Sequence, residues 1–352
     1  MKALIVSCEA GGGCTDISVA VKEKLEDHGH EVTLFDLYRD KGETTGSIFR
    51  KKAKRGAGSQ SDLMRQYLEE NPYDVIIAAD VLSAILLSVL RSSLISLPKV
   101  IYVASDYTCA PFTEDTWCDH YVIPSQKLTA EFCRRGIPKE KVIPLGMPVR
   151  KMFLTGIGKA DAGAEIGLAE DRYNILMSAV GLSGRKLFRT VRMLQTYLDR
   201  NRRARLIVFG VNQKVGRRLQ TRIENDGRIT LMQELSTPAM YMRACDVMIA
   251  GAQGSVSTEA AVLGTALIQY MPSSAYERHN AEFFSRYGMS LVVKRPGTGL
   301  LRALKVLEDE AVRRDMIKAQ RFHISQLATA EICNLAETPA LSVETGSAGV
   351  LI

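Results

Sequence analysis

The sequence lacks the patterns that build disulfide frameworks and zinc sites. Its seven cysteines, at positions 8, 14, 109, 118, 133, 245 and 333, form no C-x-x-C pair, and their number is odd. A scattered, odd set is typical of reduced thiols in a cytosolic protein, and it argues against a disulfide framework or a cysteine zinc site. Only five histidines are present, and we predict no metal site.

Long hydrophobic runs are also missing. The longest apolar stretch, "VLSAILLSVL" (Val81–Leu90), is followed by Arg91 and is too short to span a bilayer. The first residues, "MKALIVSC", carry one Lys and an apolar run too short for a signal peptide. We therefore expect a cytoplasmic protein that at most lies on a membrane, at the inner face of the cell membrane.

The bulk composition is that of an ordinary globular protein. The chain has 352 residues, of which 46% are apolar and 24% charged. Its length suggests two domains, or one large α/β unit, with ample material for a core. The net charge of +7 favours anionic partners such as phosphates or an acidic membrane face. Nucleic acid is not an expected partner, because no aromatic interleaving or known binding module is present.

Short apolar runs alternate with amphipathic segments through both halves of the chain. This alternation predicts an α/β fold of two doubly wound parallel sheets, whose carboxyl ends face each other across a ligand cleft. A stretch rich in Pro and Gly interrupts the alternation and is interpreted as a linker. The predicted parts are a first domain over 1–150, a linker over 151–170, a second domain over 171–298, helices over 299–335 and a tail over 336–352.

The first glycine loop, "SCEAGGGCTDIS" (residues 7–18), lies between a predicted strand and a helix. Gly11, Gly12 and Gly13 would let backbone N–H groups approach an anion at a helix N-terminus. The third glycine of G-x-G-x-x-G would fall at Asp16, so the sequence argues against a dinucleotide, and no G-K-[ST] follows to make a Walker loop. Cys14 is more simply a small buried thiol than a nucleophile.

Three later segments carry candidate ligand-binding residues. The loop "SAVGLSGRK" (178–186) either holds phosphates through its amides or is a tight turn beside a solvated basic helix face. In "GAQGSVSTEAAVLGTALIQY" (251–270), Glu259 could accept ribose hydroxyls or merely favour the helix dipole. In "PSSAYERHNAEFF" (272–284), Glu277 and Asn280 share a helix face.

Four segments together resemble the GT-B glycosyltransferases related to monogalactosyldiacylglycerol synthase, processive diacylglycerol glucosyltransferases and the peptidoglycan enzyme MurG. They are "GGGCTDISVAV", "SDYTCAPFTEDTWCDHYVIPS", "PLGMPVRKMF" and "GAQGSVSTEAAVLGTALIQYMPSSAYERHNAEFF", in that order. The last is similar to the family's K-P-G-G-x-T-x-x-E-A stretch followed by G-Q-E-x-x-N. The set spans residues 1 to about 290 and implies a GT-B fold with an acceptor-side first domain and a nucleotide-sugar-binding second domain.

The resemblance implies a role for each matching residue in an inverting hexosyltransferase that moves a hexose from a UDP-sugar to a lipid such as diacylglycerol. Asp106 and Cys14 would take the catalytic positions. The glycines 11–13 would serve the acceptor side or the donor phosphate. The nucleotide-sugar would contact Gly181, Ser183, Gly184, Arg185, Glu234, Leu235, Gly254, Ser255, Glu259, Glu277 and Asn280. The UDP-sugar is a substrate, and no permanently bound cofactor is expected; no D-x-D metal motif occurs.

Departures from the family pattern leave alternatives open. The family's histidine after the three glycines is Cys14, the lysine of K-P-G-G is Gly251, its first glycine is Gln253, and the glutamine of G-Q-E is Tyr276. A thiol with a pKa of about 8.5 is a poor substitute for imidazole as a base at neutral pH. The open alternatives are a degenerate UDP-sugar-binding homologue and a GT-B-type nucleotide-sugar epimerase.

One basic segment suggests a membrane contact. "GSIFRKKAKRGAG" (46–58) has five basic residues in six positions, with Phe49 before them. Each basic residue near an anionic bilayer contributes about 1 kcal/mol, although a solvated loop would explain the segment equally well. The expected membrane-contacting residues are Phe49, Arg50, Lys51, Lys52, Lys54 and Arg55.

Overall fold

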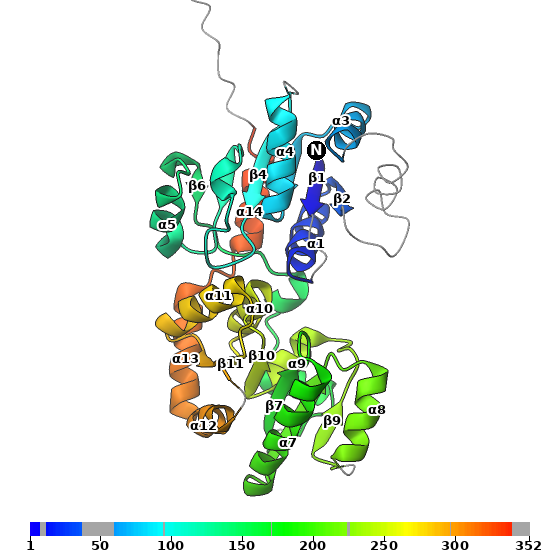
Figure 1. The fold of residues 1–352 in the computed structure, drawn as a ribbon, viewed down its shortest axis with the longest axis vertical. Helices are drawn as coiled ribbons and strands as arrows, with labels where there is room; N and C mark the ends of the chain where they lie inside the picture. Colours follow the sequence, from blue (N-terminus) through cyan, green and yellow to red (C-terminus); the bar gives the residue numbers. More distant parts are fainter. Residues whose placement is uncertain are drawn as a thin grey trace, which may run out of the picture.

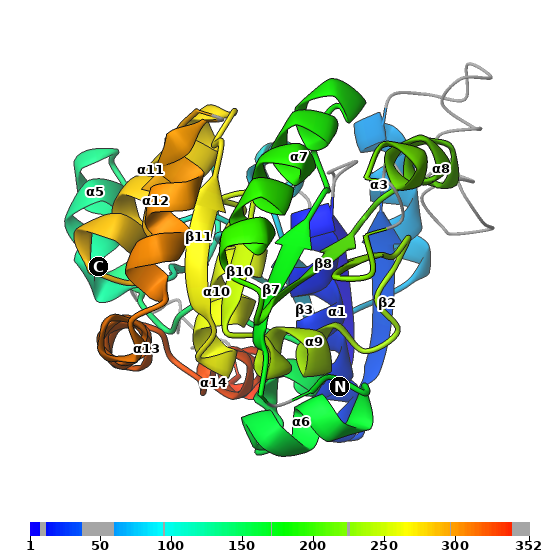
Figure 2. The same cartoon turned by 90° about the horizontal axis from the view of Figure 1, so that it is seen from below.

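The computed structural model describes residues 1–7, 12–36, 60–93, 96–169, 171–223, 226–295 and 297–339. Two sheets of six parallel strands form two lobes, one above the other in Figure 1, with helices packed around them (Figures 1 and 2). The predicted α/β architecture of two doubly wound domains is confirmed. The exact domain bounds stay a prediction.

The first sheet has the strand order β2-β1-β3-β4-β5-β6. Its strands are β1 (Lys2–Ser7), β2 (Glu31–Asp36), β3 (Val75–Ala78), β4 (Lys99–Val103), β5 (His120–Val122) and β6 (Val142–Ile143). Its helices are α1 (Gly12–Asp27), α3 (Gln60–Glu70), α4 (Val81–Ser92) and α5 (Thr129–Arg134), with 3-10 turns at Thr113–Asp115, Gln126–Leu128 and Lys139–Lys141. All four residues of β3 are buried, as expected for a parallel strand covered on both faces.

The second sheet has the order β12-β11-β10-β7-β8-β9. Its strands are β7 (Tyr173–Ser178), β8 (Ala204–Phe209), β9 (Ile229–Leu231), β10 (Val247–Ala250), β11 (Ala266–Tyr270) and β12 (Leu291–Val293). Its helices are α6 (Lys159–Glu165), α7 (Gly184–Arg200), α8 (Gln213–Arg222), α9 (Pro238–Ala244), α10 (Gly254–Leu263), α11 (Ala275–Arg286), α12 (Thr298–Leu307) and α13 (Glu310–His323).

Two segments differ in detail from the sequence-based expectation. The predicted linker 151–170 contains a 3-10 turn, Lys151–Leu154, and helix α6, which packs against α9. Pro and Gly are frequent in linkers, but here the buried Ala162 and Gly163 give α6 a small packing face. The first helix begins at Gly12, so two of the three glycines predicted to form a loop lie in its first turn.

The chain returns to the first lobe in its last helix, α14 (Ala328–Glu337), which packs on α1 (Figure 1). The Thr329 hydroxyl donates to the carbonyl of Val149 at 2.9 Å and accepts from its N–H at 3.0 Å. Gly146 has φ of +108°, and a Cβ there would lie 2.9 Å from the Cβ of Ala328, so only glycine suits this contact. The final helical region therefore spans both lobes.

Candidate functional site

The strand order of the second sheet identifies where a ligand can enter. The chain leaves β7 toward β8 and β9, then returns on the other side of β7 as β10. In an open parallel sheet, the loops after such neighbouring strands diverge and leave a crevice that binds ligands. Here those loops are residues 179–183 and 251–253, and they lead into α7 and α10. Two helix N-termini at one sheet edge suit a phosphate group.

Asp106 lies at the equivalent edge of the first sheet, three residues after β4. Its Oδ1 accepts a hydrogen bond of 2.7 Å from the Asn280 amide, and its Oδ2 accepts one of 3.2 Å from the Ser105 hydroxyl. Burial raises the pKa of Asp106 above its usual value, with a smaller upward effect from the Glu277 charge, while the two hydrogen bonds oppose the rise. The raised pKa makes this carboxylate a better base than an exposed aspartate.

Asn280 of α11 connects the loops of the two lobes. Its side chain is completely buried. Besides Asp106, its amide donates to the Ala252 carbonyl at 3.0 Å, and its oxygen accepts the N–H of Tyr107 at 2.7 Å. The resemblance predicted that Asn280 holds the sugar or a neighbouring loop; its described contacts are with loops.

Two residues that the sequence did not single out belong to the same network. The Tyr107 hydroxyl lies 2.8 Å from the Thr258 Oγ1 of α10, and the Tyr107 ring packs against Phe283 and Phe284 of α11 at centroid distances of 4.7 and 4.9 Å. The adjacency of Tyr107 to Asp106 was the available signal. Its partners lie more than 150 positions away, so sequence spacing could not identify them.

Gly254, the first residue of α10, lies close to the first lobe. A Cβ at this position would collide with the Ser105 carbonyl oxygen and lie 3.0 Å from the Met147 Cε. The next residue, Ser255, is 4% exposed, and its hydroxyl has no hydrogen-bond partner among the described residues. A glycine and an unsatisfied buried hydroxyl at a helix N-terminus are suited to a bound oxyanion.

Glu277 is engaged mainly in capping its own helix. Its Oε2 accepts from the Ser273 N–H at 2.6 Å, the Ser273 hydroxyl at 2.9 Å and the Ser274 N–H at 3.2 Å. Its other oxygen would lie 3.4 Å from a Cβ at Gly251, the position of the family's lysine. Glycine at 251 therefore removes a cation that would sit beside the carboxylate.

Glu259 of α10 faces α1 of the other lobe. It is 5% exposed, and burial raises its pKa well above the usual value, as does the nearby charge of Asp16; Arg150 acts in the opposite direction. Burial also raises the pKa of Asp16, again opposed by Arg150. Two carboxyl groups thus share one guanidinium, which favours a bound proton on one of them. The predicted contact of Glu259 with ribose stays a prediction.

The remaining predicted nucleotide residues lie at the carboxyl edge of the second sheet. Gly181 has φ of +78° in the turn after β7, Ser183 precedes the first residue of α7, and Gly184 begins that helix. The Arg185 side chain is exposed. Glu234 and Leu235 follow β9, with Glu234 exposed and Leu235 partly buried. The parallel order of β9, β8, β7 and β10 brings these loops to a single edge.

Some predicted residues cannot be placed. Gly11 and the segment containing Phe49, Arg50, Lys51, Lys52, Lys54 and Arg55 lie outside the described residues. Gly12, Gly13 and Cys14 are described only as part of the α1 backbone. Among the described residues, no helix combines the length and apolar character needed to cross a bilayer.

Sequence comparison identifies relatives that act on diacylglycerol, according to their names. A family model described as monogalactosyldiacylglycerol (MGDG) synthase matches residues 37–149. Processive diacylglycerol beta-glucosyltransferase of Staphylococcus saprophyticus is 26% identical over 235 residues, which cover 66% of this chain and 59% of that protein. The Bacillus pumilus protein of the same name is 24% identical over 223 residues, covering 61% and 57%. The matched part is less than two thirds of either relative.

Structural comparison gives matches along nearly the whole chain. The S. aureus MnaA–UDP co-structure has a TM-score of 0.66 at 14% identity and covers 95% of both chains. Acinetobacter baumannii MurG has a TM-score of 0.63 at 15% identity, covering 95% of this chain and 99% of that one. UDP-GlcNAc 2-epimerase from Neisseria meningitidis bound to UDP-GlcNAc has a TM-score of 0.67 at 14% identity, covering 95% and 99%. At these identities the similarity concerns the fold. Together with the sequence matches, it confirms the predicted resemblance: the chain has the fold of the GT-B proteins, and its sequence is similar to the monogalactosyldiacylglycerol synthase family model and to processive diacylglycerol glucosyltransferases.

Proposed function

We propose that the protein is an inverting glycosyltransferase that moves a hexose from a UDP-sugar to a lipid acceptor such as diacylglycerol. The observation that carries the proposal is the position of Asp106. Its buried carboxylate of raised pKa is bonded to Asn280, beside the loop that leads into the candidate phosphate-binding helix α10. The names of the sequence relatives supply the lipid acceptor, and the UDP-bound structural neighbours supply the donor class.

In the proposed reaction, Asp106 takes the proton of the acceptor hydroxyl while the hydroxyl oxygen attacks C1 of the sugar. The bond from C1 to the β-phosphate oxygen breaks, its electron pair leaves with UDP, and the configuration at C1 inverts. The departing negative charge would be stabilised by the N-termini of α7 and α10, by the Ser255 hydroxyl and by Arg185. Glu259 would bind the ribose, and Glu277 the sugar.

We propose that the protein contacts an anionic lipid surface. Besides the segment that contains Phe49, a second basic region supports this contact. Residues 184–222 contain twelve Lys and Arg but one Asp, an excess larger than the +7 of the whole chain. Their exposed members on α7 and α8, which we name the basic face, are Arg185, Lys186, Arg189, Arg192, Lys214, Arg217, Arg218 and Arg222.

A side-chain contact links the two helices of the basic face, and among the described residues no acid neutralises its charges. The Arg222 guanidinium of α8 stacks 4.6 Å above the Phe188 ring of α7, so the two helices are adjacent (Figure 2). Within the described part of the chain, none of these eight side chains is ion-paired with an acid. Basic residues near anionic bilayers contribute about 1 kcal/mol each.

Vesicle binding tests this assignment. Neutralising Arg217, Arg218 and Arg222 to Gln should reduce co-sedimentation with phosphatidylglycerol vesicles and leave the low binding to phosphatidylcholine unchanged. The matched control neutralises Lys305, Arg314 and Lys318, which are each ion-paired with a neighbouring acid. Equal binding by the two triple variants would contradict the assignment.

An assay with diacylglycerol in anionic vesicles and radiolabelled UDP-glucose, UDP-galactose or UDP-GlcNAc tests the activity. We expect one donor to label a lipid product. Asp106→Asn should lower the rate roughly 100- to 10,000-fold, the usual contribution of a general base. Asp115→Asn, an exposed aspartate of the same lobe, is the control. A labelled product made equally well by Asp106→Asn would contradict the role of Asp106, and no labelled lipid from any donor would contradict the transferase.

A nucleotide-sugar epimerase is the second candidate, because one of the structural neighbours described above is named UDP-GlcNAc 2-epimerase and is bound to UDP-GlcNAc. Incubating the protein with UDP-GlcNAc and no acceptor distinguishes the two, since an epimerase alone gives an isomeric sugar.

For a non-catalytic UDP-sugar sensor, Cys14→His is the informative variant. A large gain in turnover would indicate a decayed site, and a loss would show an adapted cysteine.

A further inference from the structure

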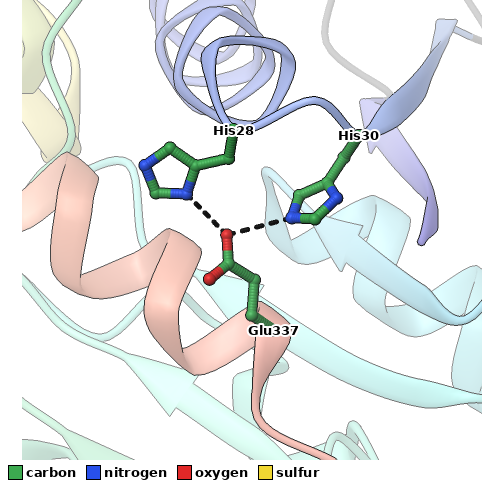
Figure 3. A group of neighbouring side chains, drawn as sticks. All are labelled: His28, His30 and Glu337. Atoms are coloured by element: carbon green, nitrogen blue, oxygen red, sulfur yellow. Dashed lines mark hydrogen bonds and ion pairs between the residues drawn. The ribbon is translucent and has the colours of Figure 1, made fainter.

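Two histidines and a glutamate from distant parts of the sequence meet in the first lobe (Figure 3). The Glu337 Oε1 lies 2.6 Å from the His28 Nδ1 and 3.0 Å from the His30 Nε2. One ligand atom from each residue lies within 4.8 Å of the other two. The three side chains are only 20 to 31% exposed, so the group is partly shielded yet accessible to an ion.

The two imidazoles are held by a tight turn between α1 and β2. Gly29, between them, has φ of +81°, a conformation that glycine adopts without strain. Its N–H donates to the Glu26 carbonyl at 2.9 Å, and the His30 N–H donates to the Leu25 carbonyl at 3.1 Å. The turn is therefore closed by backbone hydrogen bonds, and the His30 Nδ1 lies 3.3 Å from the Met1 amino group.

The carboxylate is positioned by the packing of α14 on α1. Ile332 and Cys333 are fully buried in this contact. The Lys99 ammonium donates to the carbonyls of Leu335, at 2.7 Å, and of Thr338, which flank Glu337 in the chain. Both sides of the cluster are thus fixed by interactions that do not involve the cluster itself.

We propose that His28, His30 and Glu337 bind one divalent transition-metal ion, for which Zn²⁺ is best suited. Two imidazole nitrogens and a carboxylate oxygen are a donor set that zinc uses, whereas Ca²⁺ and Mg²⁺ prefer oxygen alone. Bonds of about 2.1 Å in a tetrahedron need ligand atoms about 3.4 Å apart. Two of the separations, 2.6 and 3.0 Å, are near this value, and the third, between the two nitrogens, is within 4.8 Å. Water would take the fourth position.

The site is not part of the proposed reaction. It lies at the start of β2, the amino edge of the sheet, whereas Asp106 follows the carboxyl end of β4. Strands of this sheet run parallel, so the two places are on opposite edges. The ion would connect His28 to Glu337 across 309 positions and fasten the returning helix α14 to the first lobe. The sequence shows only the pair His28 and His30, because Glu337 lies 309 positions after His28.

Metal titration of the untagged full chain tests the proposal. After removal of metal with EDTA and dialysis, calorimetric titration with ZnCl₂ should show one ion bound per chain, and CoCl₂ should produce visible absorption bands of a bound ion. His30→Gln and Glu337→Gln should each weaken the binding of both ions at least about 10-fold, because each removes a ligand. His323→Gln and Glu331→Gln, a histidine on α13 and a glutamate on α14, should bind like the wild type.

Thermal unfolding distinguishes a metal-binding cluster from one that is only hydrogen-bonded. Zn²⁺ should raise the Tm of the wild type over its value in EDTA, and the rise should disappear in His30→Gln and Glu337→Gln. If Zn²⁺ leaves the wild-type Tm unchanged, or if both ligand variants bind zinc as tightly as the wild type, the proposal is wrong and the cluster is hydrogen-bonded only. These readouts are independent of glycosyl transfer.

Discussion

Glu259 and Asp16 are two carboxyl groups brought together from facing helices, with Arg150 as the nearby cation. In the unfolded chain each would ionise near its usual pKa, but in the folded protein burial raises both values. Between the unfolded and folded pKa the native state holds more protons than the unfolded state. Stability therefore falls as pH rises through that window, and this part of the stability is fully present only below the unfolded pKa.

Glu259→Gln should remove much of this pH dependence. An amide has the same shape as the protonated carboxyl group but cannot ionise, so the variant should lose less stability than the wild type between pH 5 and pH 8. Urea unfolding at both pH values measures the difference. Glu165→Gln, an exposed glutamate of α6, should follow the wild type. An identical fall in the wild type and Glu259→Gln would show that this carboxyl group does not titrate in the window.

Residue identities were predictable where a motif fixed them, but their contacts were not. The resemblance indicated Asp106, Glu277 and Asn280. The hydrogen bond between Asp106 and Asn280 spans 174 positions and depends on how the lobes meet. The capping role of Glu277 was local, since Ser274 and Glu277 have the spacing of a capping box. Glu259 and Asp16 face each other because α10 packs on α1, and this contact was not predictable from the sequence.

Among the elements, the strands were the most predictable. Each of the twelve strands in the described residues coincides with a short apolar run of the sequence, such as "KALIVS" for β1 and "ALIQY" for β11. Parallel strands buried on both faces give uninterrupted apolar runs, which explains this agreement. Helix α6 was missed because its sequence, "KADAGAE", is short and carries little hydrophobic periodicity.

Helix α10 is the element whose composition is most constrained by its position. Almost all of its residues are buried, and its small side chains let it lie between the lobes. Gly254→Ala should destabilise the protein by roughly 1–3 kcal/mol, because the new Cβ would overlap the Ser105 carbonyl. The midpoint of urea unfolding measures this cost.

Gly156→Ala is the matched control for this substitution, since nothing lies within 4 Å of a Cβ there. It should change the stability little. A Gly254→Ala protein as stable as the control would mean that the loop after β4 can move away without cost. If Gly254→Ala weakened UDP binding but left the stability unchanged, the new Cβ would disturb only the UDP-bound form of the protein.

At the scale of the whole molecule, the last helix fastens the chain to its beginning. Lys99 is 8% exposed, and its ammonium donates to two carbonyls at the end of α14. Lys99→Met keeps the length of the side chain but leaves the carbonyls of Leu335 and Thr338, which are partly buried, without this donor. We expect a loss of about 1–3 kcal/mol in urea unfolding, and little change for the exposed Lys139→Met. Equal stabilities would show that water replaces the ammonium.

Asn280 makes three hydrogen bonds, of which those to Asp106 and Tyr107 cross between the lobes and the one to Ala252 lies within the second lobe. Asn280→Ala removes all three but leaves other contacts between the lobes, among them the Tyr107–Thr258 hydrogen bond and the packing of α10 on α1. We expect small-angle scattering to give a larger radius of gyration than for the wild type, and UDP-sugar to reduce the difference if it binds between the lobes. Asn334→Ala, an exposed residue of α14, should scatter like the wild type. An unchanged radius in Asn280→Ala would mean that apolar packing of α10 and α11 alone closes the molecule, and that Asn280 serves only to orient Asp106.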